Sequence, residues 1–204
     1  MTVNLHPIER IYPDDKRVKP QTVAHHKARY EFAANRPIEG AKIRALDLGS
    51  GTGYGLDRLR KAGYHTVGVE IDAGAIKFSR ENYPKVGYFI HAPLEDLIWG
   101  GGKVDLITFF EVIEHLTKEN AEKVLTEASR ILNKGGALIM SVPRDINADN
   151  NGFHKSNWPF EELKATLESK FKKVIMLGQD WDTAEISSVE VEKNDFYIAV
   201  CTNG

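Results

Sequence analysis

Short apolar segments alternate with amphipathic ones along most of the chain, and turns rich in glycine, proline and asparagine separate them. Apolar runs of about four to eight residues between such turns are typical of strands. We therefore predict strands over residues 42–47, 66–70, 86–91, 104–110, 137–142, 171–177 and 195–202. The run at 104–110 is the most apolar, which indicates a central strand covered on both faces.

Between these strands, apolar residues recur at three- and four-residue spacing, the pattern of a helix with one buried face. Ala121, Val124, Leu125 and Ala128 give a clear example. Helices are predicted over residues 21–35, 54–62, 73–82, 118–132 and 158–169. Alternating strands and helices predict the α/β class, with a doubly wound, seven-stranded, mostly parallel sheet and helices on both faces.

The length of the chain favours a single domain, which we place at residues 21–204. An N-terminal arm over residues 1–20 precedes it, where Pro7, Pro13 and Pro20 interrupt regular structure. We expect this arm to pack on the domain or to close over its site.

Composition narrows the class of protein further. Hydrophobic residues make up 42% and charged residues 27%, and 27 basic against 29 acidic residues give a net charge of −2. This charge argues against a nucleic-acid partner, although it leaves a local basic patch open. The lone Cys201, the absence of an apolar leader and the absence of a membrane span favour a cytoplasmic protein without a membrane partner.

A glycine-rich loop follows the first predicted strand, with four glycines alternating with other residues over 49–55. Glycine tolerates positive φ, so the loop can turn tightly and expose backbone N–H groups. The helix that follows directs its N-terminal dipole at a ligand on the loop. The next predicted strand ends at Glu70, whose carboxylate can accept the hydroxyls of a ribose. These features predict a nucleoside-containing cofactor.

The glycine spacing excludes two common nucleotide-binding loops. The dinucleotide fingerprint Gly-x-Gly-x-x-Gly fails in every frame, because Tyr54, Leu56 or Arg58 stands in place of the third glycine. The Gly-Lys-Ser/Thr end of a Walker loop is absent. Asp47 lies two residues before the first glycine, where its carboxylate would repel a pyrophosphate.

The segment Asp-Leu-Gly-Ser-Gly-Thr-Gly at residues 47–53 resembles motif I of the class I S-adenosylmethionine-dependent methyltransferases. The resemblance covers about residues 21–202, and the turn at 132–136 is similar to the Leu-x-Pro-Gly-Gly turn of one subgroup. It implies that S-adenosyl-L-methionine is the cofactor. A glycine-rich turn without a ligand is the alternative, and the stability cost of four glycines argues against it.

The resemblance also implies which residues bind the cofactor. Glu70 would hold the ribose, Ile71, Leu94 and Glu95 would lie beside the adenine, and Phe110 and Glu111 would lie under the methionine part. Further contacts are expected from the leading helix and the glycine loop: Tyr30, Asp47, Gly49, Ser50, Gly51, Gly53 and Tyr54. In this family the leading helix passes over the amino-acid end of the cofactor, which singles out Arg29 beside Tyr30. The histidines of that helix, His25 and His26, are expected on a solvated face.

One departure from the family concerns adenine recognition. Many relatives carry an acid at the end of the third strand, where it binds the adenine amino group. This chain has Ala92 and Pro93 there, so backbone groups and Glu95 or Asp96 would take over that contact.

A second group of chemically active residues follows the predicted strand at 104–110: Glu111, Glu114 and His115. Ligands of open α/β sheets bind beyond the carboxyl ends of the strands, so this group should face the methyl acceptor. Three interpretations stay open. Glu114 and His115 stabilise the turn into the next helix, or His115 is a general base, or all three residues ligate Mg²⁺ or Mn²⁺ with His154 as a fourth ligand.

Sequence features around this group bear on the acceptor. The Glu-x-x-Glu-His pattern resembles that of ubiquinone-pathway O-methyltransferases and of RNA 3′-terminal 2′-O-methyltransferases, both metal-assisted. The polar loop with His154, and Gly178-Gln179 after the sixth strand, are similar to segments of glycan- and natural-product-tailoring methyltransferases. The Asp/Asn-Pro-Pro-aromatic tetrad of amino-methylating DNA enzymes is absent, and Cys201 lies in the last strand, away from a nucleophile's place.

These features together favour O-methylation of a small molecule or glycan. A metal-assisted RNA 2′-O-methyltransferase and a cofactor-binding module without catalysis are the alternatives. Residues 179–194 are acidic and irregular, and they predict a substrate-side flap or a surface hairpin.

Overall fold

The computed structural model describes residues 10–13, 15–36, 43–145 and 152–204. Residues 1–9 and 14 of the expected arm, residue 42 of the first expected strand and residues 146–151 of the polar loop lie outside the described residues. Among the described residues, no helix has the length and apolar character needed to cross a membrane.

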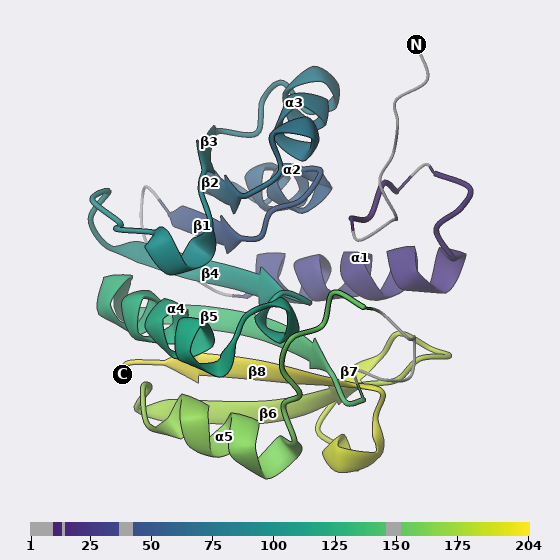
Figure 1. Cartoon of the computed structure of the whole chain (residues 1–204), viewed down its shortest axis with the longest axis vertical. Coiled ribbons are helices and arrows are strands. Elements are labelled where there is room, and N and C mark those ends of the chain that lie inside the picture. Colours follow the sequence, from purple (N-terminus) through teal and green to yellow (C-terminus); the bar gives the residue numbers. More distant parts are fainter. Residues whose placement is uncertain (1–9, 14, 37–42, 146–151) are drawn as a thin grey trace.

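A single mixed sheet forms the centre of the molecule (Figure 1). Its strands are β1 (Arg44–Leu48), β2 (His65–Glu70), β3 (Tyr88–His91), β4 (Val104–Phe110), β5 (Leu132–Pro143), β6 (Lys173–Gln179), β7 (Ile186–Ser187) and β8 (Phe196–Thr202). They are arranged in the order β3-β2-β1-β4-β5-β8-β6-β7. Strands β1 to β5 pair in parallel, whereas β8 is antiparallel to β5 and β6. This arrangement confirms the predicted doubly wound class.

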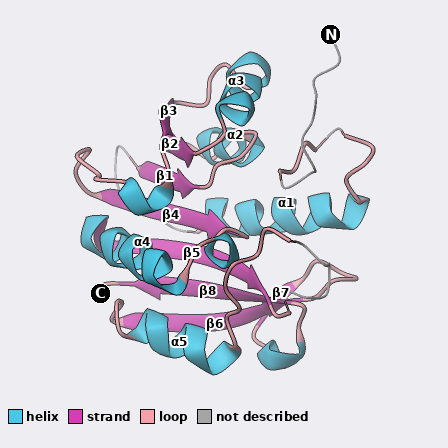
Figure 2. Cartoon of the chain, viewed as in Figure 1, coloured by secondary structure: helices cyan, strands magenta, loops and turns pink. Residues whose placement is uncertain are grey.

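Helices cover both faces of the sheet (Figure 2): α1 (Pro20–Ala34), α2 (Tyr54–Lys61), α3 (Ala73–Asn82), α4 (Lys118–Ile131) and α5 (Phe160–Glu168). Successive side chains of a strand point to opposite faces, so β1 contributes to two cores. Leu46 and Leu48 pack in the core under α4 and α5, while Ala45 packs in the core under α1 and α2. The same alternation directs Asp47 toward α1 and α2.

The sheet has eight strands among the described residues, so the predicted number of seven is corrected. The additional strand, β7, pairs antiparallel with Gly178 and Gln179 and turns the segment after β6 into a hairpin. Strand β5 also starts at Leu132 rather than at residue 137. The glycine turn expected there is an irregular part of the strand, with Gly135 at φ 79° and a register shift against β4.

Candidate functional site

The chain adds β2 and β3 on one side of β1 and then adds β4 on the other side, so the strand order reverses between β1 and β4. The glycine loop lies at the carboxyl ends of these two parallel strands. In open α/β sheets the crevice at such a switch point is where ligands bind. In Figure 1 the arrows of β1 and β4 point to the same side of the molecule.

The glycine loop has the backbone conformation that its sequence predicts. Gly49, Gly51 and Gly53 have φ of 75°, 51° and 81°, which residues with a Cβ rarely adopt. Its amides, however, are largely engaged within the protein. Those of Gly49 and Ser50 donate to the carbonyl of Val69 at 2.9 and 3.0 Å, and that of Gly51 donates to Glu70. The loop therefore offers a ligand its backbone conformation, while several of its N–H groups are already used in hydrogen bonds within the protein.

Asp47 is fully buried under this loop. Its carboxylate accepts hydrogen bonds from the Tyr30 hydroxyl at 3.0 Å and from the Thr108 hydroxyl at 2.7 Å. Burial raises the pKa of Asp47 to about 6, although the two hydrogen bonds oppose the shift. A buried carboxylate with two neutral donors and a raised pKa favours a cationic ligand, because a cation would compensate its charge.

Tyr30 fixes the position of helix α1 over the loop. Its ring is buried and meets Phe110 and Tyr54 edge-on, with centroids 5.0 and 5.6 Å apart. The ring also explains the fourth glycine of the loop segment, since a Cβ on Gly55 would lie 2.0 Å from Cζ of Tyr30. Gly55 thus permits close packing of α1 against α2.

Replacing Gly55 by Ala is expected to lower the free energy of unfolding by about 1–3 kcal/mol, the usual cost of overpacking a core. The Tyr30 ring cannot move away without losing its bond to Asp47. Denaturant unfolding measures the effect, with Gly100→Ala as the control, because a Cβ at Gly100 meets no described atom within 4 Å. Equal stability of the two variants would contradict the packing role.

Glu70 lies at the end of β2 with only 5% of its surface exposed. One carboxylate oxygen accepts from the Gly51 amide at 2.8 Å and the other from the Asp72 amide at 2.9 Å. The guanidinium of Arg10 contacts the second oxygen at 3.2 Å. This carboxylate therefore lies beside the loop, where a ribose-binding group is predicted.

The residues expected around the adenine surround the end of β3. Ile71 is 59% exposed beside Glu70, and its carbonyl contacts the ring of His91 at 2.9 Å. Leu94 packs against the core, and Glu95 accepts a hydrogen bond from the Asn120 side chain at 3.1 Å. Leu94 and Glu95 both belong to a 3₁₀ turn, η1 (Leu94–Asp96). Their adenine contacts stay a prediction.

Tyr54 and Ser50 take different positions around the loop. The Tyr54 hydroxyl contacts Nδ1 of His26 on α1 at 2.9 Å, and burial raises the pKa of Tyr54. Ser50 is buried beside Gly68, where a Cβ would lie 2.5 Å from the Ser50 hydroxyl. Tyr54 therefore links the loop to α1, and Ser50 links it to β2.

Glu111 follows β4 in a strained conformation, with φ of 53°. Its carboxylate accepts from the Ser141 hydroxyl at 2.6 Å and lies 3.3 Å from Nη1 of Arg29, which is 1% exposed. Strain of this kind in a non-glycine residue persists where the surroundings enforce it, and such residues cluster at functional sites. The side chain is directed to α1 and β5.

The structure brings three of the four expected metal ligands together. Oxygen or nitrogen atoms of Glu114, His115 and His154 all lie within 4.8 Å of one another, and Glu111 is not in this group. Glu114 is 1% exposed, and the imidazole rings of His115 and His154 are 5.0 Å apart. Nδ1 of His115 lies 3.3 Å from the carbonyl of Phe153. Because a carbonyl only accepts, this bond places the proton on Nδ1 and the ring's lone pair on Nε2.

The cap of α4 bears on the structural interpretation of Glu114 and His115. The side chain of Thr117 caps this helix by accepting from the Asn120 amide at 3.3 Å. Glu114 and His115 instead belong to the preceding 3₁₀ turn, η2 (Ile113–His115). Thr117 therefore caps the helix, and the interpretation that Glu114 and His115 stabilise the turn itself stays open.

The segment that follows β4 contacts the glycine loop through Val112. A Cβ on Gly49 would lie 2.6 Å from Cγ2 of Val112, so this side chain packs directly on the glycine loop. Residues 111–115 thus pass along the edge of the loop. Glu114 and His115 follow Val112 by two and three residues along the chain.

Sequence reasoning missed several polar residues of the site. Thr108 binds Asp47, and Ser141 binds Glu111. Both lie in buried strands, where a polar side chain needs a partner. That requirement is the signal by which the sequence could have indicated Thr108 and Ser141. Gln179 was noted for its segment, but its bond from Nε of Arg29 at 2.7 Å was not expected.

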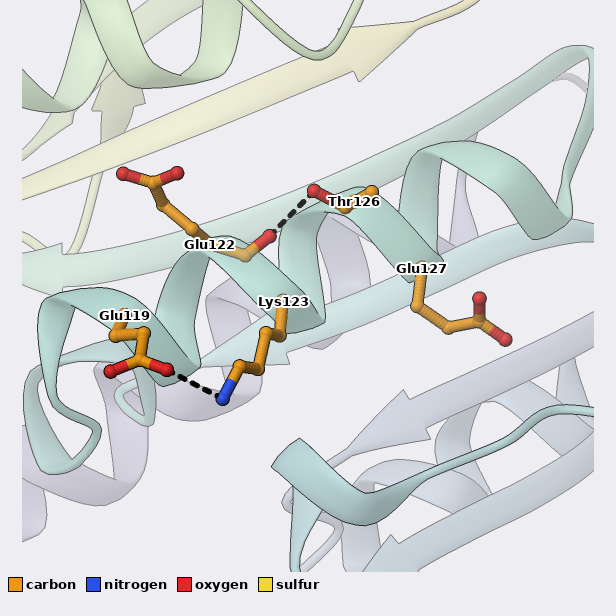
Figure 3. A pocket seen from close by; sticks show the side chains of 5 residues that line it. All are labelled: Glu119, Glu122, Lys123, Thr126 and Glu127. Atoms are coloured by element: carbon orange, nitrogen blue, oxygen red, sulfur yellow. Dashed lines mark hydrogen bonds and ion pairs between the residues drawn. The ribbon is translucent and has the colours of Figure 1, made fainter.

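A depression on α4 lies outside this site (Figure 3). Its lining residues belong to one solvent-facing stretch of the helix: Glu119, Glu122, Lys123, Thr126 and Glu127. Glu119 pairs with Lys123 at 2.8 Å, four residues along the helix. These contacts are those of an ordinary solvated helix face.

Cys201 is buried in β8, and burial raises its pKa to about 12. A thiol with this pKa is protonated near neutrality, which supports the exclusion of a cysteine nucleophile.

Comparison with known proteins identifies the domain. The family model described as a methyltransferase domain matches residues 46–140. A probable S-adenosylmethionine-dependent methyltransferase of Mycolicibacterium smegmatis is 29% identical over 150 residues, which cover 71% of this chain and 56% of that protein. A ubiquinone biosynthesis O-methyltransferase of Maricaulis maris is 26% identical over 151 residues, or 72% of this chain and 56% of that protein.

The chain spans about half the length of the curated relatives it matches. Among solved structures, an S-adenosylmethionine-dependent methyltransferase from Archaeoglobus fulgidus has a similar fold. The similarity covers 93% of this chain and 96% of that chain. The TM-score is 0.70 at 18% identity, so the likeness concerns the fold. The matched domain over residues 46–140, the sheet order and the glycine loop at the switch point make this chain similar to the class I S-adenosylmethionine-dependent methyltransferases.

Proposed function

We propose that this chain transfers the methyl group of S-adenosylmethionine to a hydroxyl oxygen of a small molecule or glycan. The observation that carries the proposal is the cluster of Glu114, His115 and His154, whose first two members follow shortly after Val112, the residue packed on the glycine loop. A cofactor bound on the loop would have its reactive end near Asp47 and Tyr30. An acceptor hydroxyl near Nε2 of His115 would then lie on the same side of the crevice.

The reaction is an in-line displacement, in which the main role of the protein is alignment. The acceptor oxygen forms a bond to the methyl carbon while the carbon–sulfur bond breaks, and the sulfur keeps the electron pair. The hydroxyl proton passes to Nε2 of His115. S-adenosylhomocysteine and the methyl ether are the products.

A metal-assisted route is the second candidate, and the close grouping of three donor side chains favours it. One carboxylate and two imidazoles fit Mn²⁺ better than Mg²⁺, which prefers oxygen ligands. A bound cation would lower the pKa of the acceptor hydroxyl. Glu114, His115 and His154 would hold it, while Glu111 remains with Ser141 and Arg29.

An O-directed reaction also has support from a relative. The Maricaulis maris protein is named for O-methylation in ubiquinone biosynthesis, and its similarity extends over 72% of this chain. The acidic hairpin after β6, with Asp180, Asp182 and Glu185, gives no basic surface for RNA on that side. A small hydroxyl compound therefore suits the site better than a nucleic acid.

Calorimetric titration with S-adenosylhomocysteine tests the cofactor assignment. We expect single-site binding that Glu70→Gln weakens by about tenfold, because the ribose hydroxyls lose a charged acceptor. Glu119→Gln on the exposed face of α4 is the control and should bind as the unaltered protein does. Absence of binding at millimolar ligand would exclude a cofactor role for this crevice.

The acceptor class is tested by methyl transfer from labelled S-adenosylmethionine to panels of phenols, sugars and short RNAs. Transfer to RNA alone, or to amines alone, would contradict the proposal.

A further inference from the structure

We infer that Arg10 is a displaceable occupant of the ribose position, and that the cofactor must remove it from Glu70 in order to bind. This inference rests on the proposed function, because it takes Glu70 as the group that accepts the ribose hydroxyls. It adds a residue that sets cofactor affinity from outside the methyltransferase motifs.

The contacts of Arg10 carry the inference. Its Nε and Nη2 lie 3.3 and 3.2 Å from Oε1 of Glu70, and its Nη1 lies 3.2 Å from Oδ2 of Asp72. Glu70 is 5% exposed and Arg10 26% exposed, so the pair is shielded from water more than a surface ion pair. Arg10 compensates a carboxylate whose burial would otherwise be costly.

The same contacts leave little acceptor capacity for a ribose. A carboxylate offers about four lone-pair positions. The amides of Gly51 and Asp72 use one on each oxygen of Glu70, and Arg10 donates twice to Oε1. Oε1 therefore receives three donors, and Oε2 receives one and keeps one acceptor position. One ribose hydroxyl can use that position, so the second competes directly with Arg10. Asp72, which is 38% exposed, gives the guanidinium a partner to keep after it leaves Glu70.

The segment around Arg10 is held against the cofactor crevice at two further points. The Thr52 hydroxyl of the glycine loop donates to the carbonyl of Ile11 at 2.6 Å. The ring of Tyr12 meets Phe78 of α3 edge-on at 4.9 Å. Figure 1 shows this segment between α3 and the start of α1, on the side toward which β1 and β4 point. Residues 10–12 thus lie over the loop.

Competition of this kind lowers the apparent affinity by the fraction of molecules in which the site is open. Arg10→Ala should therefore tighten binding of S-adenosylhomocysteine, by about three- to thirtyfold if Arg10 occupies the site most of the time. Arg17→Ala is the matched control, since Arg17 pairs with Asp15 in the same segment and does not contact Glu70 in the structure. Unchanged or weaker binding by Arg10→Ala would overturn the inference.

Trypsin cleavage after Arg10 in the unaltered protein gives a second readout. Adenosine and S-adenosylhomocysteine should both accelerate it, while 2′,3′-dideoxyadenosine, which lacks the hydroxyls, should not. Equal acceleration by all three would also count against displacement by the ribose. If the unaltered protein and Arg10→Ala both fail to bind S-adenosylhomocysteine, the cofactor assignment itself fails. If both bind it equally, the assignment stands and only the role of Arg10 is lost.

Discussion

Replacing Asp47 by Asn is expected to stabilise the fold and to weaken cofactor binding at the same time. The gain in the free energy of unfolding at pH 8 should be at most about 3 kcal/mol, the energy that corresponds to a rise in pKa of about two units. The loss in affinity for S-adenosylmethionine should be about ten- to hundredfold, as expected when a charged hydrogen-bonding partner is removed.

The stabilisation follows from the position of the carboxylate. Asp47 is fully buried, and its raised pKa of about 6 shows that the fold favours its neutral form. Asn has the same shape and no charge, so it can keep a bond to the Thr108 hydroxyl. The loss of binding follows because the cofactor brings a cationic amino-acid end to this charge.

The stability difference between the unaltered protein and Asp47→Asn should depend on pH. The folded-state pKa of Asp47 lies above its ordinary value of 3.8, so the folded protein binds this proton more tightly than the unfolded one. Stability from this group is therefore fully present below about pH 4 and is lost as the pH rises through 6. The advantage of the Asn variant should be full above pH 7 and should vanish near pH 4. Cofactor binding by the unaltered protein should strengthen over the same rise.

Denaturant unfolding at pH 8 and pH 4.5, with calorimetric titration, checks both effects. Asp57→Asn is the control, because Asp57 pairs with Arg60 at 3.0 Å and Lys61 at 2.6 Å on the surface of α2. Removal of that carboxylate should not stabilise the fold. If Asp47→Asn instead lost more stability at pH 8 than Asp57→Asn, the charge of Asp47 would not be a cost to the fold.

Elements with strong local signals could be predicted from the sequence. Helix α3 has its predicted limits, 73–82, because Asp72 caps it by accepting from the Gly74 and Ala75 amides and Pro84 follows its end. Strand β4 also has its predicted limits, 104–110, because a long apolar run is distinctive. Strand β7 has two residues, too few for any periodicity.

Long-range pairing explains the elements that sequence reasoning placed wrongly. Gly135 and Gly136 have the composition of a turn, yet they belong to β5. Leu132 already pairs with Val104, and the register then shifts before Ala137 meets Leu106. Pairing between strands, which a local pattern does not contain, decides the start of β5.

The site shows the same division between local and long-range signals. Asp47 and Glu70 were identified from their spacing to the glycines, whereas their partners Tyr30, Thr108 and Arg10 lie 17 to 61 residues away. His25 is a clear miss. It was expected on a solvated face, but it is 1% exposed, and its Nε2 lies 2.7 Å from the carbonyl of Trp181.

His25 also connects the acidic segment after β6 to helix α1. Its ring lies 4.7 Å from that of Trp181, centroid to centroid. The hairpin that begins at β6 is therefore tied to α1, the helix that carries Tyr30 and Arg29.

Replacing His115 by Ala is expected to lower turnover by about 10²- to 10⁴-fold, the usual contribution of a positioned general acid or base. The Nδ1 bond to the Phe153 carbonyl orients the ring and leaves the lone pair on Nε2, which both the base and the metal routes require. Binding of S-adenosylhomocysteine should change little, because the role proposed for His115 concerns the acceptor and not the cofactor. His65→Ala at the opposite end of β2 is the control and should keep full activity.

His154→Ala separates the two routes. If His115 acts as a base alone, loss of the neighbouring imidazole should lower turnover by less than about tenfold, and EDTA should have no effect. If the cluster holds a cation, His154→Ala should lower turnover nearly as much as His115→Ala, EDTA should abolish it, and Mn²⁺ should restore it better than Mg²⁺. Full activity of both variants would exclude both routes and leave alignment of the substrates as the whole of catalysis.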